Sequence, residues 1–143
     1  MGEQSREPRS DGKQALVGEF ASFGDDALRD VWLFDQDDHE SMYLREDVER
    51  KIADVDVSTF VDNERYGYVT RDTYADLHYT SYEYTVRGFD GYEQFRTFLV
   101  NGEAKVGVFA SFDRQKGGYD FGDLHESIAA IVADYPIDDF APK

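Results

Sequence analysis

The 143-residue sequence contains no cysteine. This absence excludes a disulfide framework, a thiol nucleophile, and zinc or iron–sulfur sites built on cysteine. The three histidines are far apart, so no HxxxH or HExxH pair exists, and a nucleophile elbow, a P-loop and a GxGxxG motif are also missing. The sequence therefore shows no recognisable catalytic apparatus. We predict a protein that is not an enzyme and has no cofactor.

Long apolar runs are absent as well. No stretch approaches the roughly 18 residues that a membrane-spanning helix needs. The first twelve residues, MGEQSREPRSDG, lack the apolar core of a signal peptide. We therefore expect a soluble cytoplasmic protein that does not bind membranes.

Basic side chains are scarce, because 15 Lys and Arg stand against 31 Asp and Glu, giving a formal net charge of −16. No basic stripe is present to hold phosphates, which argues against a nucleic-acid partner. The acidic excess has two interpretations, namely binding of a basic partner or adaptation to concentrated salt. Salt screens charges over about 3 Å at 1 M, so self-repulsion then costs little. Because the acids are scattered through every segment, we favour a halophilic protein.

The length suits one domain, since single cores are commonly built from roughly 100 to 150 residues. Hydrophobic residues make up 41% of the chain and aromatic residues 15%, which is ample for a core. We predict a disordered tail over residues 1–12, a single α+β domain over residues 13–136 and a short acidic tail over residues 137–143.

The N-terminal half indicates a helix, a hairpin and a broken helix. Apolar side chains recur at helical spacing between residues 14 and 23, and Gly24 supplies a stop. Two runs rich in aromatic and β-branched residues, ALRDVWLFD and ESMYLR, then predict the paired strands of a hairpin. Helical spacing returns over residues 46–64, where Asp56 or Ser58 can cap a second segment.

The next stretch is rich in tyrosine. The run RYGYVTRDTYADLHY predicts an irregular linker that contains one helical turn from Arg71 to Leu77. The run HYTSYEYTVRGF then alternates as a strand does, which predicts a strand from His78 to Val86 with tyrosines on one face. This strand is an edge of the predicted sheet and is available for pairing.

The C-terminal half indicates a meander and a last helix. Xaa-Gly pairs at residues 90–91 and 101–102 predict two tight turns between the strands HYTSYEYTVRGF, YEQFRTFLV and KVGVFASF. Asp120 caps a helix that Pro136 terminates. The resulting order, αββαβββα, predicts an α+β fold with a five-stranded antiparallel sheet flanked by helices.

This element order resembles the roadblock/LC7 fold over residues 14–135. The segments MYLREDV, NERYGYVTRDTY and YEYTVRGFD also resemble an uncharacterised family of small acidic proteins from haloarchaea. The roadblock resemblance implies self-association into a homodimer, through the sheet or the middle helix. It also implies docking of a small GTPase or another signalling protein. We therefore predict a non-catalytic adaptor or regulatory domain.

The tyrosine-rich strand is the candidate surface for a partner or a second copy. Tyrosines can instead fill a sheet face while their hydroxyls reach water, or stack on bases, although interleaved acids oppose the latter. An alternative function is a ligand-sensing domain with a pocket between this strand and the helices. The candidate surface residues are Tyr79, Tyr82, Tyr84 and Val86.

The acidic run DQDDHE is a candidate metal site because it is rich in carboxylates. With Asp35 as the first ligand of a calcium loop, Asp37 and His39 take positions 3 and 5. Position 12 is Glu46, but position 6 is Glu40, where the loop needs glycine. The flanking strands would also pull positions 1 and 12 apart. We predict a solvated hairpin tip without a metal.

One catalytic alternative stays open. His78 among the tyrosines would serve as a general base if it were buried beside Asp76 or Glu83, which would make the protein a hydrolase. A half-exposed strand histidine without catalytic function is the commoner outcome.

Overall fold

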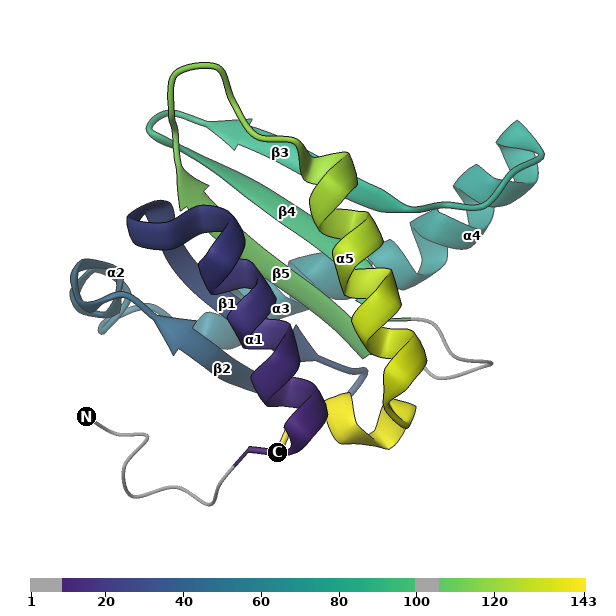
Figure 1. Ribbon diagram of the computed structural model, residues 1–143, viewed down its shortest axis with the longest axis horizontal. Helices are drawn as coiled ribbons and strands as arrows, with labels where there is room; N and C mark the ends of the chain where they lie inside the picture. Colours follow the sequence, from purple (N-terminus) through teal and green to yellow (C-terminus); the bar gives the residue numbers. More distant parts are fainter. Residues whose placement is uncertain (1–8, 100–105) are drawn as a thin grey trace.

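The computed structural model describes residues 9–99 and 106–143 and places a five-stranded antiparallel sheet between two helical layers (Figure 1). The strand order is β2-β1-β5-β4-β3. This confirms the predicted α+β class. The strands are β1 (Leu28–Phe34), β2 (His39–Leu44), β3 (Tyr84–Phe89), β4 (Tyr92–Leu99) and β5 (Val106–Asp113).

The three strands predicted for the C-terminal half are present as β3, β4 and β5. The predicted turn at residues 90–91 joins β3 to β4, and Gly91 has the positive φ of +91° that such a turn requires. The second predicted turn, at residues 101–102, lies outside the described residues. β5 is buried along nearly its whole length, as befits the central strand.

One face of the sheet is covered by α1 (Asp11–Gly24) and α5 (Phe121–Asp134), which lie side by side (Figure 1). Each helix begins at a side-chain cap. The predicted cap Asp120 accepts a hydrogen bond from the Asp123 amide, and Ser10 accepts one from the Lys13 amide. Burial of each large apolar side chain here stabilises the fold by about 1.5–3 kcal/mol. The helix residues buried in this core are Leu16, Phe20, Phe121, Leu124, Ile128 and Val132.

The other face carries three short helices, α2 (Glu46–Lys51), α3 (Val57–Arg65) and α4 (Gly67–His78). The predicted break is confirmed, because Asp56 caps α3 by accepting a hydrogen bond from the Ser58 amide at 3.0 Å. A second, smaller core lies beneath these helices. Its buried members are Trp32, Phe34, Val61, Tyr68, Phe98 and Phe109.

The linker predicted across the tyrosine-rich stretch is wrong, because residues 67–78 form the regular helix α4. Tyr66 has helical dihedral angles, so the chain passes from α3 into α4 with little interruption. The helix ends where Tyr79 adopts a left-handed conformation with φ of +57°. Gly67 stands at the first position of α4, where glycine does not interrupt a helix interior.

Packing reaches close to both ends of the described chain. Helix α1 already begins at Asp11, and the Ser10 hydroxyl donates a hydrogen bond to the Asp139 carbonyl at 2.6 Å. The C-terminal segment is not a free tail, because residues 137–140 form a short 3-10 helix whose Phe140 is fully buried. The two ends of the described chain are therefore packed against each other.

Candidate interaction surface

The edge strand β3 is shorter than the sequence predicted. His78 ends α4, Tyr79 follows as its left-handed cap, and residues 80–83 form an irregular connection, so the strand begins only at Tyr84. Within the described residues β3 pairs with β4 alone, in the register Tyr84 opposite Thr97. Its outer edge therefore has no strand partner there. Within the described residues β3, Tyr84–Phe89, is thus an edge strand of the sheet.

The four predicted surface residues do not gather into one patch. Tyr79 is 96% exposed and stands beyond the end of the helix. Tyr82 is half-buried against the smaller core, whereas Tyr84 and Val86 are half-buried against the α1 and α5 layer. The tyrosines do not share one strand face, because the backbone before Tyr84 is irregular and alternate residues there do not point to the same side of the sheet.

The surface that the sequence analysis missed is the outward face of α4. Two apolar side chains of α4 and the one at its N-cap are far more exposed than is usual: Val69 is 69%, Leu77 67% and Tyr66 71% exposed. With Thr73 they follow the spacing i, i+3, i+7, i+11, which places them on one face of a helix. Tyr74 is also exposed beside them. That spacing is readable in the sequence once the stretch is taken as helical.

This helical layer is fixed to the edge of the sheet by a buried acid. Glu64 on α3 is almost fully buried, and its carboxylate accepts hydrogen bonds from Arg87 on β3 at 2.7 Å and Arg96 on β4 at 3.2 Å. Charge-assisted hydrogen bonds offset part of the large desolvation cost of such a group. The network sets the position of α3, and thereby of α4, relative to β3.

Arg96 extends the same network. Its second terminal nitrogen donates to the Tyr82 hydroxyl at 3.2 Å and to the Thr85 hydroxyl at 3.1 Å, and those two hydroxyls are hydrogen-bonded to each other. Gly67 lies directly over this side chain, because a Cβ at that position would meet the guanidinium carbon at 2.7 Å. A glycine at the start of α4 therefore lets the helix cross the arginine closely.

The first turn of α4 is also anchored by Tyr68. Its hydroxyl donates a hydrogen bond to the Phe34 carbonyl at 3.3 Å, and its ring packs on Phe98 with centroids 4.8 Å apart. Burial of this phenol raises its pKa well above the usual range. Beyond Asp72 the helix is largely exposed, with only Ala75 half-buried. The second half of α4 thus projects from the body of the protein (Figure 1).

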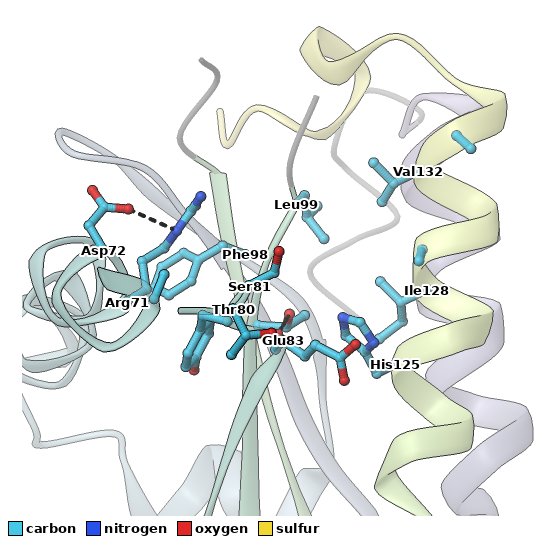
Figure 2. Close-up of a pocket in the computed structure, with 15 residues that line it drawn as sticks. Arg71, Asp72, Thr80, Ser81, Glu83, Phe98, Leu99, His125, Ile128 and Val132 are labelled. Atoms are coloured by element: carbon cyan, nitrogen blue, oxygen red, sulfur yellow. Dashed lines mark hydrogen bonds and ion pairs between the residues drawn. The ribbon is translucent and has the colours of Figure 1, made fainter. Parts of the chain in front are cut away.

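A pocket of about 800 Å³ lies beneath this projecting part, between α4 and α5 (Figure 2). It exists because β4 is longer than β3. The last pair of the two strands is Tyr84 with Thr97, so Phe98 and Leu99 extend past the edge strand and form the floor. Residues 80–83 form the rim, and Ile128, with its neighbours on α5, forms the opposite wall.

The acidic run forms a hairpin tip, as predicted. Asp35 accepts hydrogen bonds from the amides of Asp37 and Asp38 at 2.8 and 2.7 Å, and Arg65 donates to the Asp35 carbonyl at 2.7 Å. The His39 ring lies against Trp32, with centroids 6.1 Å apart. Over residues 9–99 and 106–143, no three His, Asp or Glu side chains are grouped so that they could hold a metal ion.

The structure does not place His78 where a general base would need to be. His78 stands exposed at the end of α4, its ring near Tyr74, rather than at the start of a strand. In the described part of the chain no hydrogen bond or ion pair joins it to Asp76 or Glu83. The condition for this alternative, burial of His78 beside Asp76 or Glu83, is therefore not met, and His78 lies in a helix instead of at the start of a strand.

Comparisons with known proteins give a family and a fold. A family model described as "Domain of unknown function (DUF7522)" matches residues 14–133, and no curated protein sequence matches the chain. Among solved structures, Myxococcus xanthus MglB is similar with a TM-score of 0.56 and 10% sequence identity, over 90% of this chain and 96% of that chain. Both chains share the roadblock fold. Within the described residues no helix is long and apolar enough to cross a membrane.

Proposed function

This chain belongs to the family of the domain of unknown function DUF7522, and we propose that it is a non-catalytic adaptor or regulatory domain that self-associates and binds a protein partner. The observation that carries the proposal is the exposed apolar face of α4 beside the edge of β3, which has no strand partner among the described residues. An apolar helix face of this kind is costly to leave in water, and an unpaired strand edge offers a row of free backbone groups.

Self-association through these two features would produce a closed dimer. Two β3 edges that pair antiparallel about a two-fold axis use the same residues on both copies, which makes the interface isologous and stops growth at a dimer. The pairing would extend the two five-stranded sheets into one. Glu64 bonds α3 to Arg87 of this edge, and α3 leads almost directly into α4, so we expect the exposed α4 face to lie near that axis. Burial of each apolar side chain there stabilises the dimer by about 1.5–3 kcal/mol.

Charge sets the conditions for this association. Each copy carries a formal net charge of −16, so two copies repel each other strongly in dilute buffer. Ions at about 1 M screen that repulsion within roughly 3 Å. The proposal therefore places the working protein in the cytoplasm of a halophilic cell, where the dimer forms at the native salt concentration.

The proposed partner is a small GTPase or another signalling protein, as the roadblock-like fold implies. Electrostatics favours a partner whose docking face is basic, because opposite potentials raise the association rate and disfavour acidic competitors. The α4 faces of a dimer would supply the apolar centre of such a contact, and the surrounding acids its polar rim.

Light scattering coupled to size exclusion tests the first step. We expect a dimer at 2 M KCl that dissociates progressively as the salt concentration falls towards 0.2 M. A protein that stays monomeric at high concentration in 2 M KCl would contradict the self-association on which the proposal rests.

A second candidate is a ligand-sensing domain, which the pocket between α4 and α5 favours. A sensor of this kind would remain monomeric and would gain melting temperature with its ligand, because binding to the native state alone stabilises it by mass action. The two functions are thus separated by oligomeric state and thermal shift.

A further inference from the structure

We propose that the pocket between α4 and α5 binds a small organic cation, a protonated amine that carries an apolar body. The pocket uses the inward face of α4, with Arg71, Asp72 and Ala75, whereas the proposed partner surface uses the outward face. The inference therefore does not depend on the adaptor function. It rests on the shape of the cavity, its apolar wall and the charges at its two ends.

The α5 wall is apolar and leaves room for a ligand. Ile128 and Val132 point into the pocket from successive turns (Figure 2). Ala129 and Ala133 alternate with them, and their small side chains leave space against the helix. A volume of about 800 Å³ falls in the range of small-molecule sites, which are largely apolar with a few polar groups.

The floor adds an aromatic surface. Phe98 lies beyond the last paired residue of the edge strand, and the Tyr82 ring packs near it with centroids 6.0 Å apart. Aromatic faces attract cations as well as apolar groups. The Arg71 and Arg96 guanidiniums already lie 5.6 and 5.3 Å from the Phe98 ring centroid, so the floor receives the apolar body of the ligand and the ammonium group is left to the other end of the pocket.

The end of the pocket near α5 holds a carboxylate that is free to bind. Glu83 is fixed on the rim because the Thr97 hydroxyl donates to its backbone carbonyl at 2.6 Å. Its side chain has no hydrogen bond or ion pair with any other residue in the described part of the chain. Figure 2 shows Glu83 and His125 directed to the same end of the cavity. Together they offer acceptor atoms for an ammonium group.

The opposite end does not favour an anion. Arg71 is the only arginine or lysine that lines the described pocket, and it is paired with Asp72 through a contact of 3.5 Å. Among the described residues that line the pocket, Glu83 remains as the charge without an ion-pair partner. The protein as a whole, at −16, repels anions and concentrates cations at its surface. Local and global electrostatics therefore select a positively charged ligand.

Three matched probes test the assignment, namely hexylammonium, hexanol and hexanoate, titrated into the full chain in 1 M KCl and followed by amide chemical shifts in nuclear magnetic resonance spectra. We expect saturable binding of hexylammonium with shifts at Glu83, Ala129 and Val132. Hexanol should bind about three- to tenfold more weakly, since a charge-assisted hydrogen bond is lost, and hexanoate more weakly still.

Two pairs of variants locate the site. Glu83→Gln should weaken hexylammonium about three- to tenfold and leave hexanol unchanged, whereas Glu126→Gln, the same charge change on an exposed position of α5, should alter neither. Ala129→Leu should fill the cavity and abolish binding of both probes. Ala130→Leu, one residue away and outside the pocket lining, should leave both intact.

Each contrary result overturns a defined part of the proposal. Equal affinity for hexylammonium and hexanol would overturn the cationic class, and unchanged binding in Ala129→Leu would overturn the location. No saturable binding of any probe up to its solubility limit would overturn the site itself. The oligomeric state tests the adaptor function separately, so failure of one proposal does not count against the other.

Discussion

The carboxylate of Glu64 on α3 accepts a hydrogen bond from Arg96 on β4 at 3.2 Å, and both side chains are almost completely buried. Arg87 completes the pairing at 2.7 Å. A buried acid between two arginines links the second helical layer to the strand edge that we propose as the interface. The position of the exposed α4 face therefore depends on this contact.

Replacement of that acid should destabilise the fold strongly. Glu64→Ala leaves the Arg96 guanidinium buried without its counter-ion, which costs about 3–5 kcal/mol of the free energy of unfolding. Urea denaturation at constant salt measures the change. Glu49→Ala removes an exposed acid of α2 and should alter stability by less than about 0.5 kcal/mol. Similar values for both variants would show that the pairing does not stabilise the fold.

A charge on the outward face of α4 should block self-association. Val69→Asp places a carboxylate at a position that is 69% exposed, so the monomer should keep its fold while the dimer is lost. Val55→Asp makes the same change in the connection between α2 and α3 and should leave the dimer intact. Sedimentation velocity in 2 M KCl distinguishes the two. A dimer in the Val69→Asp variant would place the interface elsewhere.

Replacement of two helical glycines by alanine should change the stability of the fold in opposite directions. In a helix interior, alanine is favoured over glycine by about 1 kcal/mol. Gly18→Ala in α1 should gain roughly that amount, because a Cβ there meets nothing within 4 Å. Gly67→Ala should lose stability, because the new Cβ would lie 2.7 Å from the buried Arg96 guanidinium carbon. Thermal unfolding should show a higher melting temperature for Gly18→Ala and a lower one for Gly67→Ala. A higher melting temperature in both variants would refute the close contact between α4 and Arg96.

The free energy of unfolding should decrease at acidic pH because the ion pairs of Arg45 are lost. Arg45 donates hydrogen bonds to Asp47 and Asp113 at 2.6 Å, which lowers the pKa of Asp47 from 3.8 to about 2 and lowers that of Asp113. The unfolded chain then binds more protons between these values, so the stabilisation is present above pH 4 and is lost as the pH falls towards 2.

A variant pair isolates this contribution. Arg45→Met should flatten the fall of the unfolding free energy between pH 5 and pH 2, measured by urea denaturation at constant ionic strength. Arg50→Met, which removes an exposed i, i+4 pair with Glu46, should keep the wild-type slope. Parallel pH profiles for wild type and Arg45→Met would refute the assignment.

The element order was readable from the sequence because it depends on short-range patterns. Alternation over a few residues gave the strands, and the Asp56 and Asp120 side chains marked helix starts through hydrogen bonds to amides two or three residues away. The acidic hairpin tip followed from its flanking strands. The errors fell at 65–83, where the pattern of tyrosines fits a strand and a helix alike.

The sequence by itself determined the α+β class, the helix caps, the turn at Gly91 and the acidic surface, since each arises from residues close in the chain or from composition. Only the tertiary structure decided where the edge strand begins and which face of α4 meets solvent. These depend on Glu64 pairing with Arg87 and Arg96, 23 and 32 residues away. No local preference encodes such a contact, because its free energy arises only when folding brings the three charges together and buries Glu64 and Arg96 away from water.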